Sequence, residues 1–169
     1  GVSIITMSVA NNIDKLIINN TNSTVTLDAN MQVNSLLTLT AGKVPLGAFN
    51  LFALGLSGGN STNYIVTNGT GSFKRPSTGA AVTYPVGPLT TKYNPLIITN
   101  TGTADNYSVN VVSGAPVNLP SATAFYVQDT WTIAEDVANG SNLTVNVQWA
   151  TADEGGSFVR AGSLFLGRY

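Results

Sequence analysis

Apolar and polar residues alternate with a period of two along most of this chain, which is the pattern of half-buried β-strands. In the segments 25–27, 37–39, 107–111 and 143–149, Val, Leu, Tyr and Trp alternate with Thr, Ser, Asn and Gln. No segment shows a comparable period of 3.6 residues. The pattern therefore predicts an all-β chain.

A second regularity, of about twenty residues, runs through residues 12–54. A fixed period of this length is typical of a β-solenoid, in which each coil buries its apolar face against its neighbours. Asn and Gly occupy the turns between laps, and we expect Asn side chains to stack at one corner. Equivalent positions of two successive repeats carry similar residues. Those of the first repeat are Val25, Leu27, Asn30, Met31 and Val33, and those of the second are Val44, Leu46, Asn50, Leu51 and Ala53.

The twenty-residue repeat is confined to the N-terminal part of the chain, which predicts two domains. A short parallel β-solenoid is expected over residues 1–58, with an apolar strand at 2–9 as an earlier lap, and a Gly, Ser and Asn stretch then marks a boundary. From residue 64, short strands recur between Pro and Gly turns, which is typical of an antiparallel β-sandwich over residues 63–169. Its strands are expected at 64–67, 71–75, 81–86, 94–99, 107–112, 126–133, 143–149 and 158–166.

Composition removes several function classes. Only 9% of the 169 residues are charged and the formal net charge is −1, so there is no basic patch for nucleic acid and no apolar run long enough for a membrane-spanning helix. The chain has neither Cys nor His, which excludes disulfides, thiol catalysis and the usual zinc sites. We expect a non-enzymatic protein without a cofactor, and a chain that is part of something longer.

Several segments resemble a recurring block in very large secreted and cell-surface proteins of Bacteroidota. They are the runs 63–75, 83–87, 93–96 and 102–109, and the tail segments 130–133, 145–149, 152–154 and 167–169. The preceding segments 37–44, 46–47 and 50–51 are similar to the β-solenoid repeats that commonly precede that block. The resemblance implies an extracellular protein exported by the type IX route, with a role in adhesion, surface coating or matrix and with no catalytic residues.

Two adjacent acid pairs, Glu135–Asp136 and Asp153–Glu154, are the candidates for catalytic or metal chemistry. Either pair could supply general acid and base groups or oxygen ligands for a structural Ca²⁺. Neither has the spacing of a calcium loop, and without His a hydrolase would depend on carboxylates alone, as glycosidases do. A solvated loop is the simpler interpretation, and a polysaccharide-active β-helix enzyme is the least favoured function.

Aromatic side chains suggest the alternative function, a carbohydrate-binding module. Exposed rings stack on sugars, so two or three coplanar rings on one exposed sheet face or loop rim would favour such a module, whereas buried rings would count against it. Trp131 and Trp149 alternate with apolar residues and are expected in the core. The candidates for glycan stacking are Tyr64, Tyr84, Tyr93 and Tyr126.

Seven asparagines begin the Asn-x-Ser/Thr pattern of glycosylation acceptors, a mild excess over chance. In most bacteria the pattern is inert. The seven are Asn19, Asn22, Asn60, Asn68, Asn106, Asn139 and Asn142.

The first strand is unusually apolar and carries no charge to protect its edge, so it is a candidate for strand donation. Its apolar residues are Val2, Ile4, Ile5, Met7 and Val9. The preferred function is an extracellular structural or adhesive module of a cell-surface protein or fibre. Its expected partners are other copies, adjacent domains of a longer chain, or surface glycans.

Overall fold

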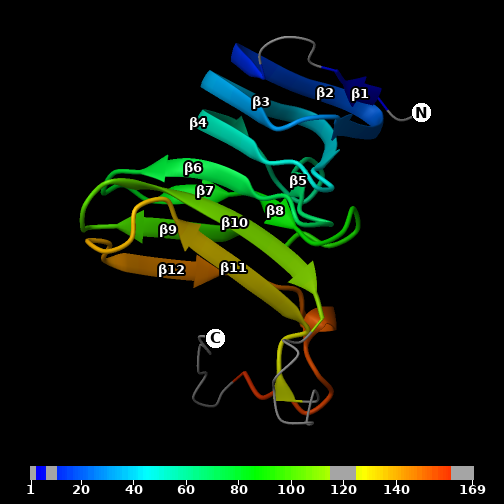
Figure 1. The fold of residues 1–169 in the computed structure, drawn as a ribbon. Coiled ribbons are helices and arrows are strands. Elements are labelled where there is room, and N and C mark those ends of the chain that lie inside the picture. Colours follow the sequence, from blue (N-terminus) through cyan, green and yellow to red (C-terminus); the bar gives the residue numbers. More distant parts are fainter. Residues whose placement is uncertain (1–2, 7–10, 115–124, 161–169) are drawn as a thin grey trace.

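The computed structural model describes residues 3–6, 11–114 and 125–160. The all-β prediction is confirmed, because a parallel β-solenoid of about four turns leads into antiparallel strands (Figure 1). The strands are β1 (Ser3–Ile5), β2 (Asn12–Leu27), β3 (Met31–Pro45), β4 (Leu51–Gly58), β5 (Ile65–Val66), β6 (Phe73–Ser77), β7 (Val82–Tyr84), β8 (Val86–Gly87), β9 (Leu96–Asn100), β10 (Asp105–Ser113), β11 (Asp129–Glu135) and β12 (Leu143–Val147). A short 3-10 helix, Thr151–Asp153, follows β12.

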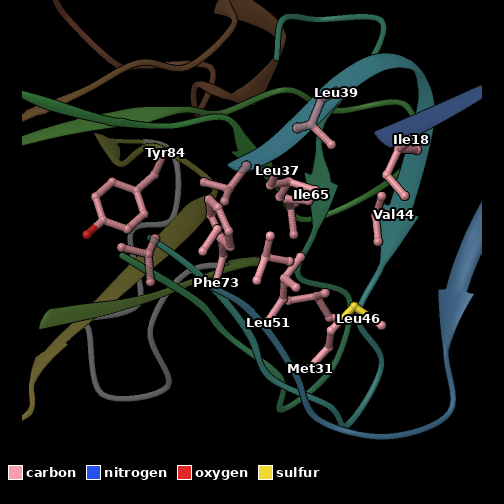
Figure 2. Close-up of a cluster of buried hydrophobic side chains, with 14 of the residues drawn as sticks. Ile18, Met31, Leu37, Leu39, Val44, Leu46, Leu51, Ile65, Phe73 and Tyr84 are labelled. Carbon is pink, nitrogen blue, oxygen red and sulfur yellow. The ribbon is translucent and has the colours of Figure 1, made fainter. Parts of the chain in front are cut away.

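The twenty-residue period predicted from the sequence is the length of one coil. β2, β3 and β4 stack in parallel, and Met31 pairs with Leu51, which pairs with Phe73 of β6. Val33 pairs with Ala53 in the same way. The inward residues of successive coils meet in one continuous core, and Figure 2 shows Met31, Leu51 and Phe73 within this cluster of buried side chains.

Asparagines stack at one corner of the coils, as the sequence predicts. Asn30 Oδ1 accepts a hydrogen bond from the backbone N–H of Asn50 at 2.8 Å. Asn50 Oδ1 in turn accepts from both the N–H and the Oγ of Ser72, each at 2.9 Å. Each side chain therefore replaces the bonding partner that the backbone loses where a coil turns.

Parallel pairing continues beyond residue 58. Val44 pairs with Ile65, and Ile65 pairs with Val86, so β5 and β8 add to the stack begun by β3. The predicted division of the chain between residues 58 and 63 stays a prediction, but parallel pairing joins its two sides, through β3 with β5 and β4 with β6.

The change from parallel to antiparallel pairing occurs at β6. One edge of β6 pairs with β4 in parallel, and its other edge pairs with β10, which pairs with β11, both antiparallel. The main path of this sheet is β1-β2-β3-β4-β6-β10-β11, and a second sheet has the order β12-β9-β7. The predicted strand at 158–166 lies mostly outside the described residues, and its described part, 158–160, is not a strand.

Buried polar contacts join the last coils to the antiparallel strands. Thr67 Oγ1 donates to the carbonyl oxygen of Val111 at 2.8 Å and accepts from the Val111 N–H at 2.9 Å. Asn110 Nδ2 donates to the carbonyl oxygens of Gly69 and Gly71 at 3.0 and 2.6 Å. A Cβ at Gly71 would lie 2.1 Å from the carbonyl oxygen of Phe49, so only glycine fits this crossing.

Candidate functional site

The two predicted acid pairs are engaged in structural contacts rather than gathered in one site. Asp136 Oδ1 lies 2.5 Å from Lys74 Nζ, and Glu135 Oε2 accepts from Ser141 Oγ at 2.5 Å. Glu154 Oε1 accepts from Trp149 Nε1 at 2.9 Å and lies 2.6 Å from Arg160 Nη2. Each of these carboxylates therefore has a cation or a hydrogen-bond donor beside it.

Asp153 instead belongs to a buried polar cluster that the sequence does not reveal. Lys92 Nζ lies 2.7 Å from Asp153 Oδ1 and 3.4 Å from Asp129 Oδ1. Asn94 Nδ2 bridges the same two carboxylates, at 2.8 Å from Asp129 and 3.1 Å from Asp153. Ser113 Oγ adds a further bond to Asp129. The cluster ties the loop after β8 to β10, β11 and the 3-10 helix.

The pKa values of the two carboxyl groups in this cluster shift in opposite directions, although burial raises both. Desolvation raises the pKa of Asp129 above its ordinary value, because the bonds from Ser113 and Lys92 only partly offset burial. Desolvation also raises the pKa of Asp153, but the bonds from Lys92, Asn94 and the Ala150 N–H outweigh it, so that the pKa of Asp153 is lowered overall. One lysine and two carboxylates fit an anchoring network, and the described residues contain no group of three or more potential metal ligands among His, Cys, Asp and Glu.

Two of the four tyrosines predicted to stack on sugars are buried, which corrects that expectation for both. Tyr64 is 1% exposed and Tyr84 is 0% exposed. Tyr64 Oη donates to the Leu89 carbonyl oxygen at 2.7 Å, and burial raises its pKa to about 12. Tyr93 is half-buried against Tyr64, with ring centroids 5.1 Å apart, and Tyr126 is half-buried. The described residues therefore do not place these four rings as one exposed platform.

The predicted glycosylation asparagines lie mainly at turns and strand ends. Asn106 and Asn142 use their amide nitrogens in hydrogen bonds, to Asp136 at 3.1 Å and to Thr101 at 2.8 Å. Asn22 lies in β2, and its side chain is outside the described residues. The exposed members are Asn19, Asn60, Asn68, Asn139 and Asn142.

The first coil leaves one edge largely open. β1 pairs in parallel with β2, but only from Val25 to Leu27, and Ile4 is 64% exposed. On that edge of β2, no other strand of the described chain pairs with residues 12–24. Of the predicted strand-donor residues, Ile4 and Ile5 lie in β1, whereas Val2, Met7 and Val9 lie outside the described residues.

An open groove crosses the continuous sheet on its outer face. It encloses about 530 Å³ and is lined by residues of β2, β3, β4, β6 and β10 and of the corner between coils. Sequence reasoning missed this groove, although the period contains its signal, since Asn12, Gln32 and Phe52 are spaced one lap apart.

Comparison of the chain with protein-family models, with curated proteins and with solved structures found no match. In the part of the chain that the structure describes, no helix has the length and apolar character needed to cross a bilayer. The geometry of the groove, the open edge and the buried cluster is therefore the basis for the proposals below.

Proposed function

We propose that this chain is a non-enzymatic structural module of a secreted or cell-surface protein, and that it associates with a second copy through the open edge of its first coil. The single observation that carries the proposal is the unpaired stretch of β2 at residues 12–24 within the described chain. Strand edges of this kind pair readily with further strands, and a two-fold contact between identical edges closes without forming a second open edge.

Incomplete burial of the first coil supports the same proposal. Ile13 and Leu16 are half-buried, whereas their partners one coil later, Val33 and Leu37, are 0% exposed. A second copy stacked on this end would cover the same positions. The other end of the solenoid needs no such partner, because β6 is already paired with β10.

Two further observations support a structural role in an extracellular setting. Every carboxylate of the two predicted acid pairs contacts a cation or a donor, which favours anchoring over catalysis. The surface relies on Thr, Ser and Asn with few charges, and the resemblance to surface proteins of Bacteroidota agrees with this composition.

Sedimentation velocity of the chain over a range of concentrations tests the proposal. We expect a dimer that Ile17→Lys disrupts, because a charge on an edge strand opposes edge pairing. Val137→Lys is the matched control, since both side chains are 67% exposed and Val137 follows β11 at the opposite side of the sheet. A chain that remains monomeric at every concentration, or a dimer that both variants weaken equally, would contradict the proposal.

A further inference from the structure

A row of side chains crosses five strands of the continuous sheet. Register pairs connect Asn12 of β2 with Gln32, Gln32 with Phe52, Phe52 with Lys74, and Lys74 with Ser108 of β10. Paired residues on neighbouring strands point to the same face of a sheet, so the five side chains form one line across it. All five line the open groove described above.

The groove offers many neutral hydrogen-bonding groups. Asn12 and Gln32 are exposed, and Asn30, Asn50 and Ser72 of the corner ladder line the groove beside them. The Oδ1 atoms of Asn30 and Asn50 accept backbone hydrogen bonds, whereas their amide nitrogens donate to no other residue in the described part of the chain. Amides both donate and accept, which suits a ligand rich in hydroxyl groups.

The charges in the groove cancel. Its charged lining residues are Lys74 and Asp136, whose Nζ and Oδ1 atoms are 2.5 Å apart. Asp136 Oδ2 also accepts from Asn106 Nδ2 at 3.1 Å. A strongly anionic or cationic ligand would meet no uncompensated opposite charge here, so the groove favours a neutral one.

A half-buried aromatic ring, Phe52, lies at the middle of the row. The faces of an aromatic ring are apolar and electron-rich, so they attract the C–H groups on the face of a sugar ring. Strands in a sheet lie about 4.8 Å apart, so side chains repeat along the row at close to the length of one hexose in an extended glycan. Five strands thus span about four hexose units.

We propose that this groove binds a neutral, extended polysaccharide of β-linked hexoses that lies across the strands. Phe52 stacks on a central sugar, Asn12 and Gln32 bond to hydroxyl groups on one side of it, and Ser108 and the Lys74–Asp136 pair bond to those on the other. The site shares only Asn12 with the unpaired stretch of β2, and its aromatic residue Phe52 lies in β4. The Phe52 and Ile17 variants therefore test glycan binding and self-association separately.

Isothermal titration calorimetry of the full chain with cellohexaose, a neutral β-linked glucose oligomer, tests this proposal. We expect saturable binding that exceeds binding of maltohexaose, whose α-linkages curve the chain, and of a galacturonate oligomer, which is charged. Phe52→Leu keeps an apolar side chain but removes the ring, and should weaken binding at least tenfold.

Tyr93→Leu is the matched control, because Tyr93 is also a half-buried aromatic residue but lies outside the groove. It should leave cellohexaose affinity unchanged, and Gln32→Ala should lower affinity without lowering the melting temperature of the protein. The proposal is overturned by an absence of binding at millimolar cellohexaose, by equal affinity of Phe52→Leu and the wild type, or by preferred binding of the galacturonate oligomer.

Discussion

Removing the cation of the buried cluster should destabilise the fold in a pH-dependent way. In Lys92→Met, Asp129 and Asp153 lose the ammonium group that lies 3.4 and 2.7 Å from them. Their side chains are 0% and 2% exposed, so water cannot replace the lost cation. Asn94 would remain as a bridge between two carboxylates of like charge.

We expect Lys92→Met to lower the free energy of unfolding by about 3 kcal/mol at pH 7. Breaking a buried ion pair by removing one partner costs about 3–5 kcal/mol, and we take the lower end because the Lys92 side chain is itself 28% exposed. In a chain of this length, such a loss lowers the melting temperature by about 6–12 °C. By contrast, Lys15→Met removes an exposed lysine of β2 and should change stability by less than about 0.5 kcal/mol.

The pH dependence follows from the two carboxyl groups. In the wild type, the lowered pKa of Asp153 contributes stability that is present above the unfolded value of about 3.9 and is lost as pH falls through the folded value. The raised pKa of Asp129 has the opposite sign, so its penalty at neutral pH shrinks on acidification. Without Lys92 both carboxyl groups should have raised pKa values, and the deficit of the variant should diminish as pH falls from 7 towards 4.

Urea unfolding followed by tryptophan fluorescence measures this effect. The chain has two Trp residues, and they lie beside the cluster, since Trp131 Nε1 donates to the Asn94 carbonyl oxygen at 3.1 Å and the ring centroids of Trp131 and Trp149 are 6.3 Å apart. Adding Asp129→Asn to Lys92→Met should restore part of the lost free energy of unfolding. The reasoning is refuted if Lys92→Met costs less than about 1 kcal/mol at pH 7, or if its deficit does not change with pH.

Three further predictions concern the coils and their packing. Asn50→Ala should cost about 1–2 kcal/mol in urea unfolding, because the N–H and Oγ of Ser72 lose their acceptor. Gly71→Ala should lower the melting temperature sharply, whereas Gly156→Ala, with no atom within 4 Å of the added Cβ, should not. The raised pKa of Tyr64, about 12, should make stability fall as pH rises above about 10, since the unfolded chain ionises first; an absorbance titration in which all six tyrosines ionise near pH 10 would contradict this.

The solenoid could be predicted from the sequence because its determinants repeat locally. Each coil places an inward apolar residue opposite its counterpart in the next coil, so the register of Met31, Leu51 and Phe73 is visible as a period. The corner asparagines are visible for the same reason, since one amide caps the next turn at nearly the same spacing. The same period also contained the row of the groove, through Asn12 and Gln32, but outward positions vary in residue type and give no apolar signal.

The buried cluster could not be predicted, because Lys92, Asp129 and Asp153 are far apart in the sequence and share no motif. These three residues come into contact only because the loop after β8 packs against β11 and the 3-10 helix. The tyrosines were misleading for a related reason. Tyr64 and Tyr84 stand next to Asn and Pro, which suggests exposure, but the junction between the last coils and the antiparallel strands needs large side chains. A phenol can be buried there, since its hydroxyl group bonds to a backbone carbonyl oxygen.

The chain contains no cysteine, so a single introduced thiol reports directly on the proposed contact between first coils. The measurement is crosslinking of Ile17→Cys by a short bifunctional maleimide, compared with Val137→Cys, whose wild-type side chain is equally exposed at 67%. If two copies pair along β2, Ile17→Cys gives a covalent dimer at a protein concentration where Val137→Cys remains monomeric. Equal yields from the two variants, or no dimer from Ile17→Cys, would contradict the proposed association.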